Sequence, residues 1–113
     1  MLLAVFTDLH ANREAVEACL AHAKERSADQ YAFLGDLVGY GADPGWVIDT
    51  VMAYVNQGAY VLMGNHDIGV LQDDRKDMNP TARFVVDWTR QNLNEVQTNF
   101  IRELPMQFML DQC

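Results

Sequence analysis

The first two-thirds of the chain alternates short apolar runs with segments in which apolar residues recur at helical spacing. Three apolar runs have the length of a strand: residues 2–7, 31–34 and 59–63. The first is apolar without interruption, which is typical of a strand covered on both faces. Helical spacing follows over residues 15–23 and again over 47–55, where Asp43 and Pro44 provide a start signal. This alternation predicts right-handed crossovers and a mainly parallel α/β sheet.

The last third of the chain is more polar and predicts two helices. Residues 79–80, Asn-Pro, mark a turn into the first, and residues 94–104 form the second, which Pro105 ends. The buried side of the first would come from four apolar residues: Ala82, Val85, Val86 and Leu93. Residues 73–77 predict a solvated loop, and residues 106–110 predict the opening of a further strand.

Composition limits the classes of protein that this chain can represent. Its 113 residues suit one domain, and 16 acidic against 8 basic side chains give a formal net charge of -8. This balance excludes a nucleic-acid binder that works through a broad basic surface. No apolar run approaches the ~18 residues of a membrane span. The two cysteines form neither a C-x-x-C motif nor a disulfide framework, so we expect a reducing, cytoplasmic setting.

Polar clusters follow directly after each of the three predicted strands. They are Asp8-Leu9-His10, Gly35-Asp36-Leu37-Val38-Gly39 and Gly64-Asn65-His66-Asp67. Because ligand sites in open α/β sheets form at the carboxyl ends of the strands, we expect the clusters to converge on one crevice. Carboxylates, imidazoles and an amide oxygen suit divalent metals such as Mn, Fe or Zn. Each cluster alone also fits an ordinary turn or a helix cap, but the three in order predict a metal site.

The ordered motifs resemble the first three motifs of the calcineurin-like metallophosphoesterase superfamily. Residues 8–12 and 34–41 are similar, more closely, to small bacterial phosphoesterases called YfcE-like or diadenosine tetraphosphatase-like. Further similar pairs lie along nearly the whole chain: Asp43-Pro44, Trp88-Thr89 and Leu104-Pro105. The resemblance implies a layered α-β-β-α sandwich, of which this chain would supply the N-terminal β-α-β-α-β part and the helices that follow. Residues 1–113 would then be a single, truncated metallophosphoesterase domain.

The same resemblance implies four metal ligands. Asp8 and His10 would bind a first metal, Asp36 would bridge two metals, and Asn65 would bind the second through its amide oxygen. The implied cofactors are therefore two divalent metal ions, from among Mn, Fe, Zn, Ni and Mg. Two such ions about 3.5–4 Å apart can clamp a phosphoryl oxygen and lower the pKa of a water between them.

The third motif is implied to supply the catalytic groups. His66 matches a histidine that is not a metal ligand, and which stabilises developing charge or protonates the leaving oxygen. Asp67 matches the residue that holds that histidine in place. Three glycines would let the backbone pass close to the metals: Gly35, Gly39 and Gly64.

These roles imply a hydrolase, a phosphatase or phosphodiesterase, that needs metal and acts on a small-molecule phosphate ester. The substrate would be a phosphomonoester, a phosphodiester or a dinucleoside polyphosphate. Two features depart from the family pattern. Ala11 stands where the family usually has glycine, and no histidine follows His66, whereas the family continues with another histidine and a Gly-His-x-His motif.

The absence of later histidines leaves a second interpretation open. The chain would be a non-catalytic truncated or regulatory fragment, or one half of a split enzyme that needs a partner chain. Because residues 2–6 and 106–110 predict apolar strands without all their neighbours, we expect self-association or a partner chain that completes the fold. Alone, the chain is expected to bind divalent metal weakly and to hydrolyse phosphate esters poorly.

Overall fold

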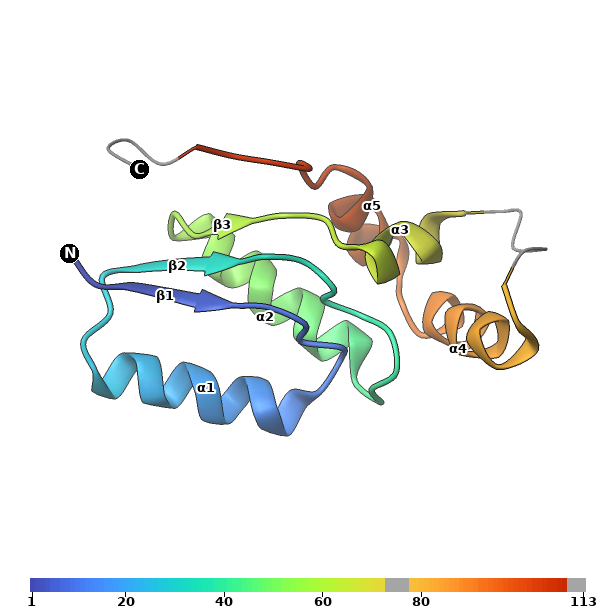
Figure 1. The fold of residues 1–113 in the computed structure, drawn as a ribbon, viewed down its shortest axis with the longest axis horizontal. Helices are drawn as coiled ribbons and strands as arrows, with labels where there is room; N and C mark the ends of the chain where they lie inside the picture. Colours follow the sequence, from blue (N-terminus) through green and yellow to red (C-terminus); the bar gives the residue numbers. More distant parts are fainter. Residues whose placement is uncertain (73–77, 110–113) are drawn as a thin grey trace.

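The computed structural model describes residues 1–72 and 78–109 and contains a three-stranded parallel sheet (Figure 1). Its strands are β1 (Leu3–Phe6), β2 (Gln30–Phe33) and β3 (Tyr60–Val61), in the order β1-β2-β3. Both pairings are parallel, with Phe6 opposite Phe33 and Phe33 opposite Val61. The predicted parallel α/β fold is therefore confirmed, although β3 is shorter than the apolar run that contains it.

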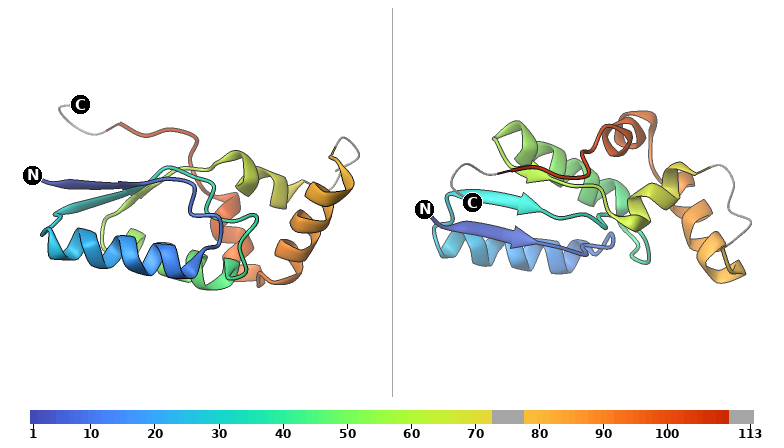
Figure 2. Two further views of the ribbon diagram at one scale, coloured as in Figure 1. Left: turned by 60° about the horizontal axis from the view of Figure 1, so that its bottom comes forward. Right: turned by 45° about the horizontal axis from the view of Figure 1, so that its top comes forward.

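Two crossover helices, α1 (Arg13–Glu25) and α2 (Pro44–Asn56), cover one face of the sheet (Figures 1 and 2). The side chain of Asn12 caps α1 by accepting a hydrogen bond from the Ala15 N–H at 3.1 Å. Asp43 does precede α2 as predicted, but its side chain makes no capping hydrogen bond. The buried faces of these helices consist of Val16, Leu20, Ala23, Val47, Ile48 and Val51. All of these except Ala23 belong with Phe33 to the main hydrophobic core.

Three further helices lie beyond the carboxyl ends of the strands (Figure 1). They are α3 (Asn65–Leu71), α4 (Pro80–Gln91) and α5 (Glu95–Arg102). The predicted starts of α4 and α5 are confirmed, because Asn79 accepts a hydrogen bond from Ala82 and Asn94 forms a capping box with Gln97. No helix in the described part of the chain has the length and apolar character needed to cross a membrane.

The helix α3 was not predicted from the sequence, where residues 64–67 were expected only to follow the third strand as a polar cluster. The reason is that Asn and Asp favour turns and helix N-termini alike. Here the carboxylate of Asp67, at the third helical position, accepts a hydrogen bond from the Gly64 N–H at 2.9 Å. The residues that end the strand therefore also begin a helix.

The expectation that β1 is covered on both faces is wrong for the described residues. Leu2 and Val5 are 43% and 53% exposed, and β1 lies at an edge of the sheet. Both crossover helices lie on the same side, as right-handed connections along this strand order require. The apolar pattern of β1 favours burial of both faces, but the described helices cover one face only.

Residues 106–109 do not form the predicted strand, but their segment runs beside β3 (Figures 1 and 2). The Met63 N–H donates to the carbonyl oxygen of Pro105 at 2.9 Å. The rings of Tyr60 and Phe108 stack with centroids 4.8 Å apart. The solvated loop predicted over residues 73–77, and residue 110 of the predicted strand, lie outside the described residues.

Candidate metal centre

The loop after β1 holds Asp8 and His10 in a backbone conformation that non-glycine residues rarely adopt. Asp8, His10 and Ala11 have φ values of 57°, 47° and 55°, all in the left-handed region. Such conformations persist where the surrounding structure enforces them, and they cluster at functional sites.

Hydrogen bonds to the loop after β2 enforce this conformation. The N–H groups of His10 and Ala11 donate to the carbonyl oxygens of Asp36 and Leu37, both at 2.9 Å. The Asp8 N–H donates in the same way to Gly35 at 3.2 Å. The loops after the two strands are therefore fastened together along their backbones.

Asp36 is oriented by the first turn of α3. Its φ of 52° is also left-handed, and its Oδ1 accepts a hydrogen bond from the His66 N–H at 2.9 Å. A bare helix start has unpaired N–H groups that favour an anionic partner, and this carboxylate satisfies one of them. One oxygen of Asp36 is thus held by α3.

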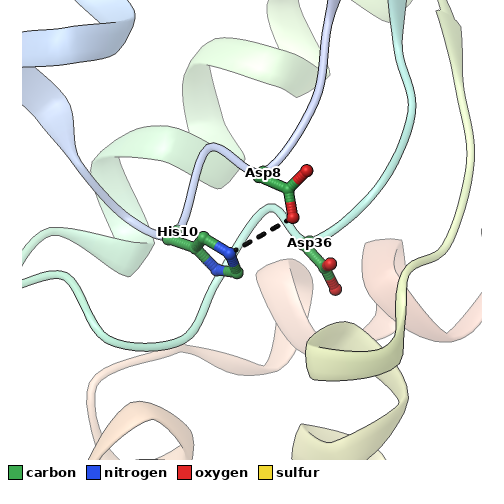
Figure 3. Close-up of side chains that lie close together, drawn as sticks. All are labelled: Asp8, His10 and Asp36. Carbon is green, nitrogen blue, oxygen red and sulfur yellow. Dashed lines mark ion pairs between the residues drawn. The ribbon is translucent and has the colours of Figure 1, made fainter.

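The side chains of Asp8, His10 and Asp36 lie close together (Figure 3). Each offers one ligand atom, and these atoms all lie within 4.8 Å of one another. His10 Nε2 and Asp8 Oδ1 are 3.4 Å apart. The hydroxyl of Thr7, hydrogen-bonded to the Asp8 carboxylate, is the main group that lowers the pKa of Asp8, and Asp36 and His10 act in the same direction. Two carboxylates and one imidazole fit a divalent cation of the hard or borderline kind.

His66 lies next to this cluster. Its ring centroid is 5.0 Å from that of His10 and 4.8 Å from that of Tyr40. Asn65 is exposed at the first position of α3, and it lines a hollow together with His66 and Tyr40. The structure thus places both predicted residues at the same end of the sheet, while the ligand role of Asn65 stays a prediction.

Asp67 is fully buried and binds backbone amides on two loops. Its Oδ1 accepts hydrogen bonds from the N–H groups of Leu37 and Val38 at 2.9 and 3.2 Å, and its Oδ2 accepts from Gly64. Burial raises the pKa of Asp67 although these three donors act in the opposite direction. The role implied by resemblance, holding His66 in place, stays a prediction. The observed contacts fasten the Asp36 loop to the start of α3.

The three glycines occur where a side chain has no room: Gly35 and Gly64 lie against backbone atoms, and Gly39 lies against the side chain of His66. A Cβ on Gly64 would lie 2.2 Å from the backbone nitrogen of Asp36. One on Gly35 would lie 2.7 Å from the nitrogen of Gly64, and one on Gly39 would lie 2.8 Å from Nδ1 of His66. Their predicted loop-shaping role is consistent with this crowding.

Tyr40 was missed by sequence reasoning. Its ring packs against those of both His10 and His66, at centroid distances of 5.2 and 4.8 Å, so that the three rings form one cluster. The only signal was its position directly after Gly39, at the end of the second motif.

The loops that follow the strands of this parallel sheet thus gather two carboxylates and two imidazoles at one end of the sheet. The chain belongs to the calcineurin-like phosphoesterase family, whose model matches residues 1–107. The resemblance found in the sequence is therefore confirmed.

The chain is also similar to individual proteins and solved structures. The chain is 32% identical over 106 residues to MJ0912, an uncharacterized protein of Methanocaldococcus jannaschii; the match spans 93% of this chain and 42% of that protein. It is 31% identical to a metallophosphoesterase from Sphaerobacter thermophilus, whose crystal structure superposes with a TM-score of 0.79. That match spans 96% of this chain and 43% of the other. A protein proposed to be a diadenosine tetraphosphatase shares the fold, at 22% identity and a TM-score of 0.67 over 91% of this chain and 42% of that one. The chain thus spans less than half the length of these relatives.

Proposed function

We propose that this chain carries the strand-end loops of a metal-dependent phosphate-ester hydrolase. The observation that supports this most strongly is the convergence of Asp8, His10 and Asp36, whose ligand atoms lie within 4.8 Å of one another. The family supports the hydrolase class, while the substrate, a phosphomonoester, a phosphodiester or a dinucleoside polyphosphate, belongs to the proposal.

Asp8, His10 and Asp36 would hold the metal, with Asn65 adding an amide oxygen to a second metal position. Divalent cations bound there would polarise a phosphoryl oxygen and make water a better nucleophile at neutral pH. Asp36 is suited to a shared position because α3 fixes one of its oxygens, Oδ1, through the His66 N–H. The fastened loops keep the ligand atoms together without a large rearrangement.

His66 would act as the general acid. Its ring adjoins that of His10, which places it beside the ligand cluster without being in it. In the imidazolium form, a ring N–H of His66 would donate a proton to the ester oxygen as the bond to phosphorus breaks, and the alcohol would leave neutral. Asp67 would keep α3, and therefore His66, in register with the Asp36 loop.

The assigned roles separate in two variants. In an assembly that completes the site, Asp36→Asn should weaken manganese binding and turnover of an aryl phosphate together, because it removes ligand charge. His66→Asn should leave manganese binding near the wild-type level while slowing turnover by ~10²–10⁴-fold, the usual size of a general-acid contribution. His22→Asn is the matched control, since His22 is an exposed histidine in α1, away from the loops.

Two outcomes would contradict this proposal. Equal loss of manganese binding in Asp36→Asn and His66→Asn would show that the roles are wrongly divided. A wild-type chain that binds manganese but hydrolyses no phosphate ester would favour the alternative, a non-catalytic chain or one that needs a partner. Self-association or pairing with a second chain stays a prediction, which light scattering tests directly.

A further inference from the structure

An apolar hollow adjoins the candidate site on the side of α4. Its volume is about 260 Å³, and its lining consists of Tyr40, Gly41, Ala42, Phe84, Val85 and Trp88. Tyr40 and Phe84 are 70% and 69% exposed, which is unusual for large aromatic side chains. No charged side chain of the described residues lines this hollow.

The hollow is connected to the candidate site through Tyr40. The loop after β2 holds Tyr40 in a left-handed conformation, with φ of 69°, and its ring packs against the rings of His10 and His66. A second hollow of about 190 Å³ on the same side is lined by Asn65 and His66, and it shares Tyr40 and Val85 with the first. Tyr40 therefore borders both the ligand cluster and the apolar space beside it.

Helix α4 presents its part of the lining as a fixed surface. Phe84 and Trp88 are four residues apart and therefore lie on one side of the helix. Other residues of α4 hold the helix in place. Val86 and Thr89 are buried, and α4 packs against α3. The aromatic side chains thus face the Tyr40 loop from an anchored element.

We propose that Tyr40, Phe84 and Trp88 form a subsite for a flat aromatic leaving group of the phosphate ester. This inference rests on the proposed function, in which His66 protonates the leaving oxygen. The leaving group must then lie next to His66. The space next to His66 is bordered by Tyr40, which also lines the adjoining hollow with Phe84 and Trp88.

The chemistry of the lining favours an aromatic ring over a polyphosphate chain. A polyphosphate leaving group needs cationic side chains, and the described lining offers none. Aromatic side chains favour a planar ring, which they contact by stacking or edge-on packing. The volume is below the about 300–1,000 Å³ of drug-sized pockets, so it suits a single ring system. An aryl group and a nucleobase share this chemistry.

The first arm of the test measures substrate selectivity with manganese present. The quantity is the ratio of kcat/KM for phenyl phosphate to kcat/KM for glycerol phosphate. Phe84→Ala should lower this ratio about three- to tenfold, the size of one aromatic contact, and Phe84→Tyr should restore it. Val96→Ala is the matched control, because Val96 is a similarly exposed apolar residue on α5 and should leave the ratio unchanged. Adenosine 5′-monophosphate in the same assay distinguishes a nucleobase from an aryl group.

The second arm measures binding without turnover. In a Trp46→Phe background, Trp88 is the remaining tryptophan of the sequence, so its fluorescence reports on the hollow. Phenylphosphonate should change this emission in the presence of manganese, whereas methylphosphonate, which has the same anionic group without a ring, should not.

The outcomes separate this inference from the proposed function. Equal responses to the two phosphonates, or an unchanged selectivity ratio in Phe84→Ala, would overturn the subsite. Hydrolysis of the esters in the same assay would still support the proposed function. A ring-specific response of Trp88 without hydrolysis of any ester would uphold the subsite and contradict the proposed function.

Discussion

The helix layer beneath the sheet and the loops at its carboxyl end are built in opposite ways. In α1 and α2 the backbone is regular, and the buried face consists of aliphatic side chains. In the strand-end loops the backbone is unusual and the chemistry-bearing groups remain accessible. Of the six described non-glycine residues with positive φ, five lie in these loops: Asp8, His10, Ala11, Asp36 and Tyr40.

The difference shows how a small α/β unit can place candidate ligands on residues whose left-handed backbone conformation is unfavourable for non-glycine residues. Each left-handed residue costs of the order of 1–3 kcal/mol, which only well-paired surroundings can offset. In this chain the surroundings are the backbone hydrogen bonds between the first two loops and the carboxylate of Asp67 behind them. Substitutions in the layer should therefore act on stability, and substitutions in the loops on binding.

The largest effect on stability is expected from Phe33→Ala in the core. Phe33 is fully buried, and its ring packs against those of Phe6 and Tyr54 at 5.3 and 5.9 Å. Its truncation should lower the free energy of unfolding by about 3–5 kcal/mol in urea titrations. Phe84→Ala, at an exposed position on α4, should change it by about 0.5 kcal/mol or less. Similar losses in the two variants would contradict the described core.

The next largest effect is expected from Asp67→Ala, which acts between the two regions. It leaves the N–H groups of Leu37, Val38 and Gly64 without their acceptor. Leaving several buried donors unsatisfied should lower the free energy of unfolding by about 2–4 kcal/mol. A loss below about 1 kcal/mol would show that the loops are not held together by this carboxylate.

Asp67 also predicts a direction of pH dependence. Burial raises the pKa of Asp67 in the folded chain above its ordinary value of 3.8. A raised pKa means that the stabilisation from this group is fully present below the ordinary pKa and is lost as pH rises through the raised one. The free energy of unfolding of the wild type, relative to Asp67→Asn, should therefore fall as pH rises from acid to neutral. A relative gain would show that the three amide donors dominate over burial.

The smallest effect is expected from a pair of alanine-to-glycine substitutions. Ala23 is helical and buried in α1, so Ala23→Gly should destabilise by about 1–2 kcal/mol. Ala11 is equally buried but left-handed, so glycine relieves strain of about the same size as the methyl contact it removes. Ala11→Gly should therefore change the free energy of unfolding by about 0.5 kcal/mol or less. Equal losses would contradict the contrast between the two regions.

The sequence predicted the strands, most of the helices and the gathering of the three clusters, because these follow from periodicity and from parallel topology. It did not predict α3, since Asn65 and Asp67 favour a turn and a helix start equally. The sequence could not predict which faces of β1 are covered. An apolar run indicates that a strand favours burial, but it does not identify the residues that pack on each face. Tyr40 was missed because its role depends on two rings that are distant in the sequence.

Manganese binding measured by electron paramagnetic resonance tests the central claim most directly, because it reports on the ligands without needing a substrate. The wild type should bind Mn²⁺, and Asp36→Asn should bind it at least about tenfold more weakly. Asp49→Asn, an exposed aspartate on α2, should bind it like the wild type. Equal Mn²⁺ affinity in the wild type and Asp36→Asn would contradict the assignment of Asp8, His10 and Asp36 as a metal site.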